Sequence, residues 1–445
     1  MNRPLPSQRS DDAFRRQDEP GGPITTHLPG RRLALLFVVS MFSTTGNSAM
    51  LSVMPSIGTQ LRIPDVVISL AFTFSALLWA IFAPYWARRS DQRGRKAMMT
   101  LGLAAFTAHF FIGGAMLWLG LSGWIGGWLA LALFAAVRLI NGALGSATPS
   151  AVQAYVASRT GPEDRTRALS LIASSMGLGT VIGPGLAPLL ILPFVGLIGP
   201  FLAFGLFGLA TIIALRLYLP HDRPAFPAHG GVTSPSGEET FETGPWSEPD
   251  AASGAPRLRW GDPRVRGWIV SAAIGGTAQV ALSAITGFLV LDRLGLRADP
   301  HGGAGPIGLV MMSGAFATLL AQWGLIPMLR PSPKTSVLAG MALAAVGMAL
   351  WGMGQNLHAI ALGYAIASLG FGLHRPGFTA GMSLAVSQAE QSQVAGIVSS
   401  MLGAIYVLSV LAVWLYGHEP VLIFTILPAL CIIAAISVQR LTPAS

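Results

Sequence analysis

Twelve apolar runs constrain this chain more than any other feature of its sequence. Each run is close to the roughly 20 residues that a helix needs to cross the hydrocarbon core of a bilayer. In lipid every backbone polar group must be bonded internally, so a span is either a helix or a strand of a closed barrel. The period-two alternation of barrel strands is absent. The sequence therefore predicts an all-α membrane protein, with transmembrane helices at residues 33–55, 66–86, 97–120, 126–157, 168–192, 197–219, 266–290, 305–328, 336–354, 358–386, 394–416 and 419–438.

The small number of charged residues supports the same interpretation. Only 11% of the 445 residues are charged and 52% are hydrophobic, whereas soluble domains carry about 25% charged residues. The net charge of +9 could indicate a nucleic-acid partner, but the basic residues lie in short loops between apolar runs. We therefore expect no nucleic acid and interpret these residues as orientation signals. The one cysteine, Cys431, excludes an internal disulfide and a cysteine cluster, and we expect no metal.

A break near the middle divides the chain into two halves. Residues 220–264 are rich in Pro, Gly, Ser and Glu and lack apolar periodicity, which is typical of a flexible linker. The linker joins two expected six-helix bundles, residues 33–219 and 265–438. Residues 1–32 are polar and are expected to form a disordered cytosolic tail, and residues 439–445 a second, short tail.

The distribution of Lys and Arg among the short loops predicts the orientation. With the N-terminus in the cytosol, most basic loop residues lie on the cytosolic side, and only Arg62, Arg293 and Arg297 lie opposite. Because basic loops stay in the cytosol, both termini and the linker are expected there. We expect an integral protein of a bacterial inner membrane. The cytosolic set comprises Arg88, Arg89, Arg93, Arg95, Lys96, Arg159, Arg165, Arg167, Arg330 and Lys334.

Three short patterns recur in the same order in the two halves. Such recurrence is typical of transporters built from two related repeats, whose substrate site lies near the middle of the membrane between them. The sequence thus predicts two pseudo-symmetric bundles. The matched patterns are Gly145-x-x-x-Pro149 with Gly372-x-x-x-Pro376, Ile172–Met176 with Ile397–Met401, and Trp79 before Pro84 with Trp323 before Pro327.

The loop after the second run, residues 87–96, resembles the signature loop of the major facilitator superfamily, and residues 76–84 before it resemble the tetracycline/drug proton antiporters. Gly94 permits a tight turn between two helix ends. Asp91 can accept hydrogen bonds from helix amides or pair with an arginine, and Arg95 and Lys96 can pair across the cytosolic face. The resemblance implies a gate loop that joins the two halves in one conformation. The alternative is a basic loop that only sets topology.

A basic residue lies deep inside the fourth run. Arg138, with Asn141 and Gly142, resembles the arginine-x-x-glutamine-glycine motif of the same family. A charge at this depth costs about 3 kcal/mol, so Arg138 should face a water-filled cavity or a partner. The resemblance implies a part in proton coupling or in substrate binding. The alternative is a structural arginine bonded to helix carbonyls.

The fifth run contains a glycine pattern at Gly179, Gly183, Pro184 and Gly185. It resembles the antiporter motif of the drug-exporting members, which is thought to seal the protein against leak. Glycines four residues apart permit close approach of another helix, and Pro184 removes a backbone donor and bends the span. Packing alone is the alternative explanation.

Several other polar or aromatic residues on the spans are candidates for the substrate or proton pathway. His374 and Arg375 stand beside Pro376 and either line the cavity or lie near the cytosolic end. His109 stands alone in the third run and is interpreted as a packing residue. Trp79 and Trp323 either stack on an aromatic substrate or simply pack. Spans that line the cavity in this family also carry Asn47, Gln279 and Tyr364.

No Asp or Glu stands in the middle of any run, and Ser43 takes the place of the acidic residue in the first span of the tetracycline antiporters. Proton exchange usually needs a titratable group in the cavity, and here only His374, His109 and Asp292 could substitute. Protons therefore stay a candidate coupling ion, although no carboxylate in the middle of a run is available to carry them. A neutral-to-positive cavity suits neutral, zwitterionic or anionic amphipathic solutes.

The sequence contains no phosphate-binding lysine loop, nucleophile elbow or His-Glu-x-x-His string, so we expect neither an enzyme nor a cofactor. The first hypothesis is a monomeric secondary active transporter that exports a drug-like or metabolite solute by alternating access, with that solute and membrane lipid as partners. The second is uptake of a neutral or anionic aromatic nutrient such as a vitamin. The third, a non-transporting membrane sensor or assembly factor, has little support because the tail and linker carry no patterned domain.

Overall fold

The computed structural model describes residues 29–160, 162–192, 194–220, 261–386 and 391–439. Within these ranges the chain forms helices joined by short turns, without a strand. Most of the expected tails and of the expected linker lies outside the described residues. The predicted all-α class is therefore confirmed for the part of the chain that forms the bundle.

The helices follow the twelve predicted runs. Eleven of the described helical segments are long and apolar enough to cross a membrane, and α14 contributes a shorter apolar segment, Ile405–His418. The first half contains α2 (Gly30–Gln60), α3 (Asp65–Arg93), α4 (Arg95–Leu121), α5 (Gly127–Gly145), α6 (Ala147–Arg159), α7 (Pro162–Leu189) and α8 (Gly199–Tyr218). The second half contains α9 (Arg266–Arg293), α10 (Pro300–Leu319), η2 (Leu320–Leu325), α11 (Ile326–Leu329), α12 (Pro333–Met353), α13 (Leu357–Leu384), α14 (Gln391–His418) and α15 (Pro420–Gln439).

Two of the spans are interrupted, and a proline follows each interruption. The fourth span divides into α5 and α6 at Ser146, because Pro149 has no N–H to donate to the carbonyl of Gly145 one turn earlier. The eighth span widens into the π-helical segment η2 just before Pro327. The breaks fall in spans that do not correspond in the repeat, because the counterparts of the fourth and eighth spans, α13 and α3, are continuous helices.

Gly94 separates α3 from α4 and has a φ of +92°, a conformation that residues with a Cβ rarely adopt. The predicted tight turn is therefore confirmed. Lys96 lies in the first turn of α4, and its expected pairing across the face stays a prediction. Its Nζ donates in this structure to the carbonyl oxygens of Arg216 (2.9 Å) and Leu219 at the end of α8. A cation there satisfies carbonyls that a helix leaves without partners.

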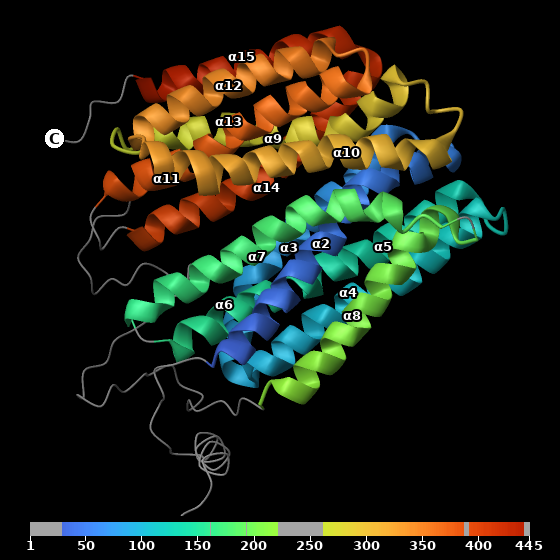
Figure 1. The fold of residues 1–445 in the computed structure, drawn as a ribbon, viewed down its shortest axis with the longest axis horizontal. Coiled ribbons are helices and arrows are strands. Elements are labelled where there is room, and N and C mark those ends of the chain that lie inside the picture. Colours follow the sequence, from blue (N-terminus) through green and yellow to red (C-terminus); the bar gives the residue numbers. More distant parts are fainter. Residues whose placement is uncertain (1–28, 161, 193, 221–260, 387–390, 440–445) are drawn as a thin grey trace, which may run out of the picture.

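Each end of the bundle has a distinct character. At the end that we call the basic face, α2 begins at Gly30 and α3 ends at Arg93. At the opposite end, the Arg297 face, α2 ends and α9 turns into α10 through Arg297. The two halves meet through α2, α3 and α7 on one side and α9, α10 and α14 on the other. Figure 1 shows that the halves touch toward the Arg297 face and diverge toward the basic face.

Matching contacts in the two halves confirm the repeat. In the first half, Ser75 Oγ of α3 donates to the carbonyl of Arg138 in α5 (3.1 Å). In the second half, Thr318 Oγ1 of α10 donates to the carbonyl of Ser368 in α13, also at 3.1 Å. The paired glycines correspond as well, since Gly145 lies against α3 and Gly372 lies against α10 and η2. For the pattern at 397–401, the side chains of residues 397–400 lie outside the described residues.

Candidate functional site

Arg138 lies in the interior of the first half, with only 6% of its surface exposed. Its guanidinium carbon stands 3.8 Å from the centre of the Phe72 ring of α3, a cation–π contact. Its Nη1 is 3.4 Å from Nε2 of His109 on α4. Its Nε has no hydrogen-bond partner. The side chain therefore contacts an aromatic ring and an imidazole, and not the helix carbonyls of the structural alternative.

The local sequence brings α3 close to Arg138. Gly142, one turn after Arg138, leaves room for the backbone of Ser75, because a Cβ at Gly142 would overlap the carbonyl oxygen of Ser75. Asn141 is buried beside it, and its Oδ1 has no partner. The buried Arg138 and Asn141 thus leave one donor and one acceptor unmet within a single turn of α5, which is unusual in a protein interior.

His109 has a second role that the sequence did not reveal. Its expected burial is correct, because the imidazole is fully buried beside Phe110 and Phe134, with ring centroids 5.2 Å and 5.4 Å away. The same imidazole also contacts the guanidinium of Arg138, with Nε2 3.4 Å from Nη1. The one clue in the sequence was the need of a deep charge for a partner, and that need does not say which helix provides it.

The second half has a more neutral set of polar contacts. Nε2 of His374 lies 3.1 Å from Oγ of Ser271, and the hydroxyl of Tyr364 lies 3.4 Å from Oγ of Ser283. Arg375, next to His374 in the chain, is exposed. The structure therefore does not bring Arg375 together with His374, which is buried.

The remaining pathway candidates are spread over the bundle. Asn47 donates to the carbonyl of Ser43 in its own helix (3.0 Å), and Gln279 is half-buried in α9. Trp323 is 53% exposed in the π-helical segment. Trp79 is closest to the Arg138 region, because it borders Gly145 together with Asn141.

The glycine pattern of α7 lies between the two halves. On one side, a Cβ at Gly179 would lie 2.5 Å from the carbonyl oxygen of Met41 in α2, and Ser48 Oγ donates to the Gly179 carbonyl at 3.1 Å. On the other side, Gly185 meets Met312 of α10, and the Pro184 carbonyl meets Gly308. Gly183 also faces α2. The glycine pattern therefore packs α7 closely against α2 of its own half and also against α10 of the other half.

A charged network joins the halves at the Arg297 face. The guanidinium of Arg297 binds both carboxylate oxygens of Asp65 on α3, at 2.9 Å and 2.6 Å, and Oδ1 of Asp292 on α9 at 2.6 Å. The hydroxyl of Tyr416 on α14 donates to Asp292 at 2.6 Å. The hydrogen bonds to Asp65 raise the pKa of Arg297 above its ordinary value. A cavity of about 430 Å³ adjoins this network, which we call the Arg297 latch (Arg297, Asp65, Asp292 and Tyr416).

The sequence missed the Arg297 latch. From the sequence, Arg297 was interpreted only as an orientation signal and Asp292 only as a candidate proton carrier. Asp65 lies more than two hundred residues away in the chain, so its pairing with Arg297 was not foreseen. For the gate loop, Arg95 is half-buried, whereas the side chain of Asp91 lies outside the described residues.

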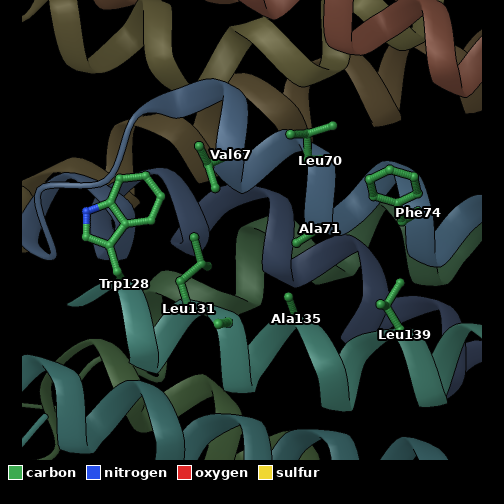
Figure 2. Close-up of a pocket in the computed structure, with 9 residues that line it drawn as sticks. Val67, Leu70, Ala71, Phe74, Trp128, Leu131, Ala135 and Leu139 are labelled. Atoms are coloured by element: carbon green, nitrogen blue, oxygen red, sulfur yellow. The ribbon is translucent and has the colours of Figure 1, made fainter. Parts of the chain in front are cut away.

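An apolar groove of about 200 Å³ lies between α3 and α5 on the outside of the first half. Figure 2 shows side chains of the two helices facing each other across it. Phe74 and Trp128 are half or more exposed there, as expected of side chains that contact lipid. The groove has no charged residue and is separate from the polar sites. Its lining is Val67, Leu70, Ala71, Phe74, Trp128, Leu131, Ala132, Ala135 and Leu139.

The sequence matches the family model described as Major Facilitator Superfamily over residues 36–410. It is 32% identical over 156 residues to the multi-drug resistance efflux pump PmrA homolog of Lactococcus lactis subsp. lactis (strain IL1403), covering 33% of each chain. It is 31% identical over 115 residues to multidrug resistance protein 2 of Bacillus subtilis (strain 168), covering 26% of this chain and 25% of the relative. The chain thus aligns with no more than about a third of the length of these relatives.

Solved structures share the fold over nearly the whole chain. The human organic anion transporter MFSD10 (TETRAN) superimposes with a TM-score of 0.61 at 18% identity, covering 93% of this chain and 100% of that one. A peptide transporter POT in complex with sulfate superimposes with a TM-score of 0.69 at 13% identity, covering 94% and 96%. At these identities the likeness concerns the arrangement of the helices.

Proposed function

Because the chain belongs to the major facilitator superfamily, whose members carry small solutes across membranes, we propose that it exports a drug-like or metabolite solute. In this proposal the basic face lies in the cytosol and the Arg297 face lies outside, as the positive-inside rule favours. The names of two relatives, a multi-drug resistance efflux pump homolog and a multidrug resistance protein, support export as the direction of transport.

The observation that carries the proposal is the position of α7. Its glycine pattern allows α2 on one side and α10 on the other to approach the helix closely. A helix packed tightly against both halves can keep the interface closed to leak while the halves rock, which is what export against a gradient requires. If the glycine pattern served helix packing alone, a close contact with one of the two helices would be enough.

Alternating access gives the Arg297 latch a role in the cycle. The bond between Arg297 and Asp65 joins the halves at the Arg297 face, and the halves diverge toward the basic face (Figure 1). We assign this arrangement to the state that receives solute from the cytosol. Release to the outside then requires the latch to break and the halves to close at the basic face, where the gate loop around Gly94 would join them.

The site residues in this proposal are Arg138 and Asn141, with Trp79 beside them. They lie in the middle of the fourth and second spans, where related transporters place their substrates. The proton is the proposed coupling ion. With no carboxylate in the middle of any predicted span, His109, in contact with Arg138, is the base through which protonation and solute binding would influence each other.

Uptake of an anionic aromatic nutrient is the second candidate. The observation that favours it is the positive charge of Arg138, which membrane-embedded exporters of cationic drugs would not need. Uptake and export share the same fold and the same cavity, so only the direction of flux separates them.

Transport by oriented vesicles tests the proposal. Inside-out and right-side-out vesicles containing the full chain are compared for accumulation of dyes, antibiotics and vitamins, with and without a pH gradient. Export predicts accumulation in inside-out vesicles that disappears when the gradient is collapsed. Accumulation in right-side-out vesicles alone would establish uptake, and flux that ignores the gradient would remove the proton from the mechanism.

A further inference from the structure

The guanidinium of Arg138 has no carboxylate to balance its charge. Within the part of the chain that the structure describes, Arg138 takes part in no ion pair, unlike Arg264 and Arg297. The runs 66–86, 97–120 and 126–157, which contain its neighbours, have no Asp or Glu at all. The helices around Arg138 therefore cannot supply a negative charge at its depth in the membrane.

The groups that do contact Arg138 leave part of its hydrogen-bonding capacity free. His109 can offer one acceptor, at 3.4 Å, and Phe72 offers only the face of its ring. Nε of Arg138 is buried without a partner, and so is Oδ1 of Asn141 one turn later. A buried charged donor without a partner is costly, and a carboxylate is the acceptor that relieves this cost best.

Phe72 and Thr73 place the surroundings of Arg138 close to the boundary between the halves. Phe72, on which the guanidinium rests, precedes Thr73 in α3. Thr73 Oγ1 donates to the carbonyl of Tyr406 in α14 of the second half, at 3.4 Å. Movement of the halves along this contact would open the region next to Phe72 and Arg138 to a solute between them.

We infer that Arg138 binds the carboxylate of an aromatic organic anion. The Nε of Arg138 donates to the anion, and the Phe72 side of the cluster provides the apolar surface for its ring. His109 is a positioning residue that holds Nη1 and so fixes the direction of the guanidinium. The inference rests on the proposed transport function and names the substrate class of its central site.

Equilibrium dialysis of the purified full chain against three radiolabelled probes with the same ring system tests the inference. The probes are 1-naphthoate, the neutral 1-naphthamide and the cationic 1-naphthylmethylamine. We expect naphthoate to bind about tenfold more tightly than naphthamide, since a charge-assisted hydrogen bond is lost with the neutral probe. Arg138→Gln should abolish this preference, Arg138→Lys should retain part of it, and Arg266→Gln, at an exposed position at the start of α9, should leave it unchanged.

Several outcomes would overturn the inference. Equal binding of naphthoate and naphthamide to the wild type would do so, as would absent naphthoate binding or a preference that survives in Arg138→Gln. The wild-type charge series and Arg138→Lys decide the question even if Arg138→Gln fails to fold. In proteoliposomes, flux of naphthamide without naphthoate would refute the inference and leave transport standing. Binding of naphthoate at Arg138 without flux of any probe would instead refute the transport proposal.

Discussion

The two halves share a backbone plan but treat polar side chains differently. Ser75 with Arg138 and Thr318 with Ser368 make the same helix-to-helix contact at the same length. Around the first contact lie a buried charge and unmet polar atoms, whereas around the second lie neutral hydroxyl and imidazole pairs. The comparison teaches that two halves can share one helix arrangement when only the contacts between helix backbones are kept the same. The buried charge and the unmet polar atoms can then lie in one half alone.

The largest difference in flux is expected between a variant of Arg138 and a variant of the neutral polar pairs in the second half. Arg138→Gln removes the charge that would bind the solute, and flux should fall by at least about tenfold. Tyr364→Phe removes only a long bond to Ser283, and flux should stay within about twofold of the wild type. Initial rates in proteoliposomes containing equal amounts of inserted protein measure both. Equal losses in the two variants would contradict the assignment of the site to the first half.

The bond that joins the halves is the next target. Arg297→Gln removes the ion pair with Asp65 and should increase opening at the Arg297 face about fivefold, as expected for a partly exposed pair worth about 1 kcal/mol. Ser56→Cys reports the opening, because Ser56 is buried near Gly303 of the second half. Its labelling rate with a membrane-impermeant maleimide is measured in a Cys431→Ser background.

Arg266→Gln is the matched control for the labelling experiment, because it removes an exposed arginine from the same half without touching the latch. If Arg297→Gln and Arg266→Gln give the same labelling rate, the Arg297 latch does not hold the halves together.

The paired glycines offer a smaller and more selective comparison. A Cβ at Gly372 would lie 2.7 Å from the Cβ of Ala321 and 3.1 Å from a backbone oxygen. Gly372→Ala should therefore lower the free energy of unfolding by about 1–3 kcal/mol. The three atoms nearest to a Cβ at Gly145 would belong to the side chains of Asn141 and Trp79. Gly145→Ala should lower the free energy of unfolding by less than Gly372→Ala does. It should reduce flux by more.

Thermal unfolding and proteoliposome flux, measured on both glycine variants, test this contrast. A Gly145→Ala protein with normal flux would show that Asn141 and Trp79 can move without harm to the site.

The smallest effect is expected in the second half. Ser271→Ala removes the hydroxyl next to His374, and the free energy of unfolding should fall by about 1 kcal/mol, the typical worth of one hydrogen bond. Flux should change little. Denaturation in detergent and flux measurements report the two quantities, and a large loss of flux would place His374 in the pathway after all.

The fold could be predicted well because the membrane restricts the alternatives. Apolar length determined the spans, whereas the break of the fourth span at Ser146 and the π-helical segment before Pro327 were not predicted. The side-chain partners could not be predicted in the same way. Arg138 was recognisable as a deep charge, but its contact with His109 depends on how α4 rotates against α5.

The Arg297 latch was still less accessible to sequence reasoning. Arg297 and Asp65 are both common loop and helix-end residues, and only the folded chain brings them together. The position of Lys96 was missed for a related reason, because its partners are backbone carbonyls that no sequence pattern reveals.

Lys96 has a mechanical consequence for the whole transporter. Its ammonium group joins the first turn of α4, directly after the turn at Gly94, to the last carbonyl groups of α8, just before the chain leaves the first half. The start of the connection between the halves is thereby anchored to the loop that is expected to move. A displacement of the end of α8 would therefore be passed to the first turn of α4, so that these two helix ends would move as one unit at the basic face.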